Sequence, residues 1–146
     1  MATIAAKSAE RTKVDTTPQV HLSTEELKGR IRVHKTTYTW LAGYVDAGST
    51  VTGTLLPTGA RIVGGRLSSQ AGLATSTLQV SINAVNLHAA LAVGAATAQT
   101  DTLPDKDNFH NVDGVNFGGY APVITVGTAA MVAGNKLSLF LFYVVD

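Results

Sequence analysis

The residues best suited to metal chemistry gather in one segment of the chain, between positions 105 and 113. An EF-hand calcium loop needs an oxygen ligand at its fifth position, glycine at its sixth and glutamate at its twelfth. Phe109 and His110 occupy the fifth and sixth positions here, and no glutamate stands at the twelfth. Two interpretations stay open: an irregular cation site, or a solvated loop whose polar side chains bond to their own backbone. The candidate ligands are Asp105, Asp107, Asn108, His110, Asn111 and Asp113.

Glycines near the middle of the chain have part of the pattern of a phosphate-binding loop. The spacing from Gly59 to Gly64 is the required one. The next two residues should be lysine and then serine or threonine, which reach the phosphates and Mg²⁺. Gly65 and Arg66 stand there instead. We therefore predict no nucleotide cofactor, and we interpret the two adjacent glycines as a β-bulge or a close approach of two strands.

The other catalytic residue types are present but are not arranged for catalysis. No two of the four histidines have the ligand spacing of a metal-binding helix, and the abundant serines form no Gly-x-Ser-x-Gly elbow. Residues 31–146 contain six aspartates and no glutamate, and four of the six lie in the loop 101–120. A carboxylate pair for glycoside hydrolysis therefore has no evident place. Because the chain has no cysteine, thiolate chemistry is excluded, and we expect neither an enzyme nor a bound cofactor.

The chain divides into an arm, residues 1–30, and a body, residues 31–146. The arm has no helix or strand periodicity over most of its length. Its segment from Leu22 to Gly29 has the capping pattern of one short helical turn. We expect this arm to be extended and to bind outside its own domain, on a partner or a neighbouring subunit. The contact residues would be Ile4, Lys7, Arg11, Lys13, Val14, Val20 and Leu22.

The body predicts an all-β fold in one domain. Runs rich in Val, Ile, Thr and aromatic residues, separated by turn residues, indicate strands near 31–45, 50–56, 60–68, 77–84, 121–127 and 136–145. The Ala-rich segment 88–99 favours either a short helix or a packed loop. Short strands at this spacing predict an antiparallel two-sheet β-sandwich of jelly-roll type. Its core should include Leu55, Ile62, Leu78, Val80, Ile82, Leu137, Leu139 and Leu141.

Two strand segments carry apolar residues that suggest contacts beyond the core. The last strand is apolar on both faces, so it must be covered twice, and we expect Phe140, Phe142 and Val144 at a subunit interface or sheet-packing surface. Near the start of the body, three aromatic side chains share one strand face by the period-two rule. They would form either core, subunit interface or a sugar-binding platform. These three are Tyr38, Trp40 and Tyr44.

Charged residues are scarce and unevenly placed. They make up 14% of the 146 residues, against about 25% in a typical soluble domain. Residues 1–35 hold seven basic and four acidic residues, a local charge of +3, and no charged residue lies between Leu67 and Thr100. Few charges make self-association easier to tolerate. We therefore expect the protein to form a homo-oligomer, and specifically a trimer.

Neither nucleic acid nor a membrane is an expected partner. Strong nucleic-acid binders neutralise about 6–10 phosphates, whereas residues 1–35 carry only +3 and no aromatic side chain to stack on bases. The longest apolar run, Leu137 to Val145, is far below the ~20 residues of a membrane-spanning helix. The N-terminus also lacks the apolar core of a secretory signal. The protein is expected to fold in a cytoplasm.

One stretch of the body resembles a known family. The run from Val45 to Leu67, with Leu-Pro-Thr-Gly-Ala-Arg-Ile at 56–62, is followed by Leu-Gln-Val-Ser-Ile at 78–82. Together they are similar to small structural proteins of tailed bacteriophages, often capsid decoration (cement) subunits. The similarity spans roughly residues 40–85.

This resemblance implies a place in the virion and a set of partners. Family members are β-sandwiches that trimerise on the outside of an icosahedral shell, with extended termini that tie capsomers together. The chain would then be made in the host cytoplasm, bind the major capsid protein and stabilise the shell by bridging its subunits. Two alternatives stay open: a phage fibre or neck attachment module, and a lectin-like binding module.

Overall fold

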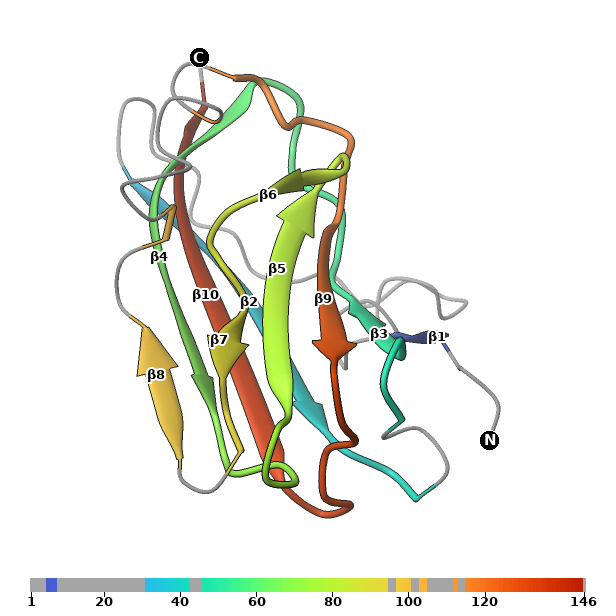
Figure 1. The fold of residues 1–146 in the computed structure, drawn as a ribbon. Coiled ribbons are helices and arrows are strands. Elements are labelled where there is room, and N and C mark those ends of the chain that lie inside the picture. The colour runs from blue at the N-terminus through green and yellow to red at the C-terminus, as the bar shows by residue number, and fades with distance from the viewer. Residues whose placement is uncertain are drawn as a thin grey trace.

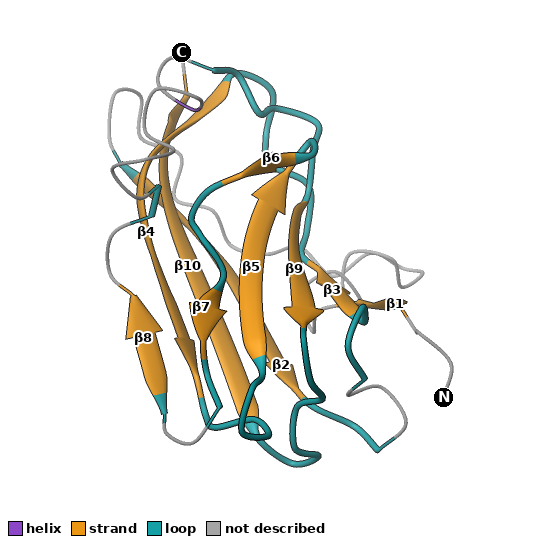
Figure 2. Ribbon diagram, in the orientation of Figure 1, coloured by secondary structure: helices purple, strands orange, loops and turns teal. Residues whose placement is uncertain are grey.

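Two β-sheets packed face to face form the body of this computed structural model (Figure 1). The structure describes residues 5–7, 31–42, 46–94, 97–100, 103–104, 112 and 115–145. Strands account for most of the regular structure in these ranges (Figure 2). The predicted all-β sandwich is confirmed.

The first sheet has six strands in the order β1-β3-β9-β5-β6, with β7 also paired to β5. Its long central pair, β5 and β9, is antiparallel, whereas β1 runs parallel to β3. Strand β1 therefore attaches the described part of the arm to one edge of this sheet. The strands are β1 (Ala5–Lys7), β3 (Thr50–Thr52), β5 (Thr77–Ile82), β6 (Val85–Asn86), β7 (Leu91–Ala92) and β9 (Pro122–Gly127).

The second sheet has four antiparallel strands in the order β2-β10-β4-β8. They are β2 (Arg32–Thr39), β4 (Ala60–Ser69), β8 (Ala98–Thr100) and β10 (Lys136–Val145). Strand β10 lies in the middle, between β2 and β4, which are far from it in sequence (Figure 1). The C-terminal strand is therefore the structural centre of this sheet.

Side-chain alternation explains why these segments form strands that bury one face. Buried residues recur at every second position along β5, β9 and most of β10. Seven of the eight predicted core residues are buried, at no more than 5% exposure. These are Ile62, Leu78, Val80, Ile82, Leu137, Leu139 and Leu141.

Leu55 was expected in the core and lies outside it, with 54% of its surface exposed. The chain leaves regular strand geometry after Thr52, and Gly53 and Thr54 are both buried in succession. That irregularity shifts the alternation by one residue, so Leu56 is buried in place of Leu55.

Turn chemistry sets several strand ends. Asn83 and Ala84 have positive φ angles, so β5 ends at Ile82, short of the predicted 84, and a two-residue hairpin leads into β6. The predicted turn at Pro57 to Gly59 is present, with the Ala60 amide donating to the Pro57 carbonyl at 3.1 Å. The described residues of the Ala-rich segment 88–99 form β7, the start of β8 and loop rather than a helix. The Cα of Gly94 approaches the Ala74 carbonyl so closely that a Cβ would lie 2.2 Å from its oxygen, as in a packed loop.

Several predicted features lie outside the described residues. They are the helical turn at 22–29, Tyr44 and the candidate cation ligands between 105 and 113.

His88 bridges a gap in the first sheet. Strand β9 pairs with one edge of β5 along its whole length, but on the opposite edge β6 and β7 leave Val80 without a strand partner. The His88 side chain takes that place. The Val80 amide donates to His88 Nε2 at 3.1 Å, while His88 Nδ1 donates to the Ala89 carbonyl. The Leu87 amide donates to the Val80 carbonyl at 2.9 Å. The imidazole thus acts as a substitute for a backbone acceptor in the ladder.

We expect His88→Ala to lower the free energy of unfolding by about 1–2 kcal/mol, because it leaves a buried amide without an acceptor. Urea unfolding at a fixed protein concentration measures the change. Asn86→Ala is the matched control, since Asn86 is exposed on the neighbouring strand β6. Equal stability of both variants would contradict the bridging role.

Candidate functional site

The outer face of the second sheet is the most distinctive surface in the described structure. It is formed by the outward residues of β2, β10 and β4, and we call it the β2–β10–β4 face. Strand register arranges its side chains in rows across the three strands. From one end to the other, these rows are Val144–Arg61, Val33–Phe142–Gly64, Lys35–Phe140–Arg66, Thr37–Ser138–Ser68 and Thr39–Lys136.

Next to the Val144–Arg61 row at one end of this face, the exposed side chains are apolar. Val33 is 55% exposed and Val63 is 50% exposed, and the half-buried Phe142 lies between their strands. Val63 is the extra residue of a β-bulge, where the register of β10 against β4 shifts after Phe142. The bulge places an additional apolar side chain on the outside of the sheet. This part of the face is therefore apolar and accessible.

The next row is basic. Lys35 Nζ lies 5.9 Å from the centre of the Phe140 ring, within range of a cation–π interaction. Arg66 is directly opposite Phe140 on the other neighbouring strand. Lys35 and Arg66 are exposed, as is Lys136 two rows farther along. Phe140 is thus half-buried between two cationic side chains.

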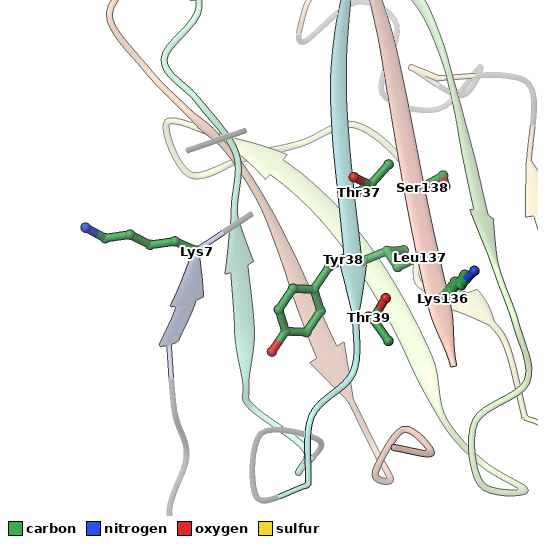
Figure 3. A pocket seen from close by; sticks show the side chains of 7 residues that line it. All are labelled: Lys7, Thr37, Tyr38, Thr39, Lys136, Leu137 and Ser138. Atoms are coloured by element: carbon green, nitrogen blue, oxygen red, sulfur yellow. The ribbon is translucent and has the colours of Figure 1, made fainter. Parts of the chain in front are cut away.

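An open hollow of about 420 Å³ lies beside the far rows of this face, at the edge strand β2 (Figure 3). Hydroxyl groups and two lysines line it, and the Lys7 side chain extends away from the other lining residues (Figure 3). We call it the edge hollow. Its lining residues are Lys7, Thr37, Tyr38, Thr39, Lys136, Leu137 and Ser138.

The aromatic residues near the start of the body are largely internal. Trp40 is 1% exposed, and its ring meets the Tyr38 ring edge-on at 5.1 Å between centroids. A buried indole has no face to offer a sugar. The core interpretation of Trp40 is therefore confirmed, while Tyr44 lies outside the described residues.

The two adjacent glycines, interpreted from the sequence as a β-bulge or a close approach of two strands, lie inside a strand. Gly64 and Gly65 are in β4, next to the bulge, and a Cβ on Gly65 would lie 2.9 Å from the Phe140 carbonyl oxygen. Both interpretations, bulge and close strand approach, are confirmed.

The described histidines are held by hydrogen bonds within the fold. His34 is buried between two threonines, with Nε2 at 3.1 Å from Thr36 Oγ1 and Nδ1 at 3.4 Å from Thr54 Oγ1. His88 belongs to the first sheet. In the part of the chain that the structure describes, no group of three or more His, Asp or Glu side chains is placed to hold a metal ion.

The structure reaches only part of the predicted contact set. Of the arm residues, Lys7 lies on β1, paired with Thr52, and Ile4, Arg11, Lys13, Val14, Val20 and Leu22 are outside the described ranges. Phe140, Phe142 and Val144 all lie on the outer side of β10, each half-buried. Their place at an interface stays a prediction.

The basic row was not foreseen from the sequence. Alternation along a strand at 33–39 was the one available signal, since it places Val33, Lys35 and Thr37 on one face. Nothing local indicated that Phe140 and Arg66 lie beside Lys35, because that depends on strand register. Among the described residues, no helix has the length and apolar character needed to span a membrane.

Solved structures from phage capsids share this fold. A chain in the capsid of Ralstonia phage GP4 matches with a TM-score of 0.74 and 18% sequence identity, over 98% of this chain and 99% of that chain. A chain in the cyanophage Pam1 capsid asymmetric unit matches with a TM-score of 0.57 and 20% identity, over 90% of this chain and 97% of that one. Comparison of the sequence with protein-family models and with curated proteins finds no match. The likeness to these capsid chains is therefore one of fold.

Proposed function

We propose that the chain is a decoration, or cement, subunit of a tailed-phage capsid, bound to the outside of the shell. The observation that carries this proposal is the near full-length likeness of its fold to chains from phage capsids. The stretch from Val45 to Leu67, which resembles decoration proteins, supports it independently. A subunit of this kind binds the major capsid protein and needs no catalytic site.

Bridging explains how such a subunit would stabilise a shell. A protein that binds only the assembled shell shifts the assembly equilibrium by mass action. In a homotrimer, each further contact on the same shell is intramolecular, so moderate single contacts add up to strong attachment. The arm would add a tether: β1 holds its described residues to the body, and the residues between β1 and β2 would reach a neighbour or the shell.

The lectin-like alternative loses its main support, because Trp40 is in the core. A fibre or neck attachment module remains the second candidate, since the same sandwich could attach to another virion part. The number of copies in each virion distinguishes the two: a shell protein is present in large, regular excess over a fibre or neck protein.

Co-sedimentation with empty shells that lack this protein tests the proposal. We expect the full chain to pellet with the shells at a fixed ratio to the major capsid protein, and to raise their resistance to heat. Without shells, it should sediment as a trimer. A 15.2 kDa monomer would contradict the trimer, and failure to pellet would contradict the decoration role.

Deleting residues 2–22 tests the tether within the same assay. The body should keep its fold and oligomeric state, because the described part of the deleted segment is the short edge strand β1 of the first sheet. Binding to shells should weaken strongly. Undiminished binding of the deleted form would show that the arm is not a tether.

A further inference from the structure

We propose that the β2–β10–β4 face, together with the edge hollow, binds an acidic protein segment that also carries apolar side chains. The identity of the partner, the capsid shell, rests on the proposed function. The surface and the chemistry of the contact rest on the structure of the face.

Charge is the first reason for this partner. The face presents three exposed cations, Lys35, Arg66 and Lys136. Among the residues that the structure describes, the only acid is Asp46, which lies in the loop between β2 and β3 and not on this face. A partner with carboxylates is therefore electrostatically complementary, and the potential of the face would steer its approach.

The apolar part of the face decides between a protein and a nucleic acid. Val33 and Val63 are each at least half exposed. Val33 is in the row next to the basic row, and Val63 precedes Gly64 of that same row. Nucleic-acid binding is dominated by contacts to phosphates, which apolar side chains cannot make. A protein surface covers such residues with its own apolar side chains at the centre of a contact and places charges at the rim. The pattern of this face therefore favours a protein.

The edge hollow is suited to bind a carboxylate. Thr39 and Ser138, which carry hydroxyl groups, are among its lining residues, and so is Lys136, which carries an ammonium group. Hydroxyl donors beside an ammonium group are suited to a carboxylate, since hydrogen bonds to ionised acceptors are the stronger ones. An acidic side chain of the partner could enter the hollow while its neighbours lie along the face.

A second copy of the same face is an unsuitable partner. Two such faces would bring Lys35 and Arg66 of one copy against the same cations of the other, and like charges oppose that pairing. We therefore place Phe140 and Phe142 at an interface with a different protein, in place of the subunit interface that the sequence predicted.

A charge-matched pair of variants tests this surface. Lys35→Gln with Lys136→Gln removes two positive charges from the face. Asn86→Asp with Thr58→Asp lowers the net charge equally at exposed positions away from it. All four positions are exposed, so both proteins should fold like the wild type, which circular dichroism and urea unfolding verify. Each is titrated against empty shells that lack this protein.

At an ionic strength of about 0.15 M, we expect the lysine variant to bind shells at least about tenfold more weakly than the wild type. The control should stay within about twofold. In about 1 M salt, the wild type and the lysine variant should converge, because the screening length falls to ~3 Å.

Several results would overturn the proposal. Equal weakening in both variants would show a general charge effect, and unchanged binding of the lysine variant would exclude this face. Duplex DNA bound by the wild type and lost in the lysine variant would show a nucleic-acid surface instead. A change of oligomeric mass in the lysine variant would assign the face to self-association. If the wild type does not bind shells, the result contradicts the decoration role. It then also contradicts the capsid shell as the partner of this face.

Discussion

Replacing Trp40 with alanine should lower the free energy of unfolding by about 3–5 kcal/mol, as truncation of a large buried aromatic side chain does. Trp40 is 1% exposed and packs edge-on against Tyr38, so the variant loses buried area, leaves a cavity and breaks an aromatic pair. Urea unfolding at one protein concentration gives the change, since the stability of an oligomer depends on concentration.

Two further variants define the cause of this loss. Leu41→Ala, at a residue 56% exposed, should change stability by less than about 0.5 kcal/mol. Trp40→Phe should be milder than Trp40→Ala, because it keeps an aromatic ring and the indole Nε1 has no hydrogen-bond partner in the described structure. Trp40 is the single tryptophan, so we expect the folded protein to show blue-shifted tryptophan emission, which reports the burial of this residue. An unaltered unfolding midpoint in Trp40→Ala would place this residue on the surface and restore the sugar-platform interpretation.

Replacing Gly65 with alanine should cost about 2–3 kcal/mol, near the upper end of the usual range for overpacking. A Cβ at Gly65 would lie 2.9 Å from the Phe140 carbonyl oxygen and 3.0 Å from Leu103 Cβ. The oxygen belongs to the backbone of β10, so the contact is relieved only by separating the two strands. Urea unfolding measures the loss.

The neighbouring glycine is the matched control. The nearest atom to a Cβ on Gly64 would be at the edge of the Phe142 ring, at 3.3 Å, and that side chain can rotate away; its other neighbours lie at ordinary contact distances. Gly64→Ala should therefore change the free energy of unfolding by less than about 1 kcal/mol. Alanine also lowers the conformational entropy of the unfolded chain, which offsets part of any loss. Equal losses in the two variants would show that loss of glycine itself, rather than the contact with β10, is responsible.

Local pattern was sufficient for much of the fold. Alternation from Thr77 to Asn83 identified the buried face of β5, because a strand places every second side chain on the same side. The apolar C-terminal segment was predicted to be a strand, and it is the central strand of the second sheet. That a partner covers its outer face stays a prediction. The likeness to phage capsid proteins, first indicated by the residues from Val45 to Leu67, is confirmed at the level of the fold.

Local pattern failed where the backbone is irregular. Leu55 and Leu56 are adjacent and equally apolar, so burial of one rather than the other depends on the shift at Gly53 and Thr54. The sequence around His88 did not indicate its role either. Its function in the ladder exists only because β6 and β7 leave Val80 without a strand partner on the edge of β5 opposite β9.

The sequence by itself determined that Val33, Lys35 and Thr37 share one face and that Phe140 and Phe142 share another. Only the tertiary structure decided that these faces are the same surface, with Arg66 completing the basic row. The physical reason is that side-chain alternation is a property of one strand. Register and neighbour order, in contrast, come from the packing of two whole sheets, which sums contacts between segments distant in the chain. A binding surface that crosses three strands is therefore encoded in pieces and assembled only by folding.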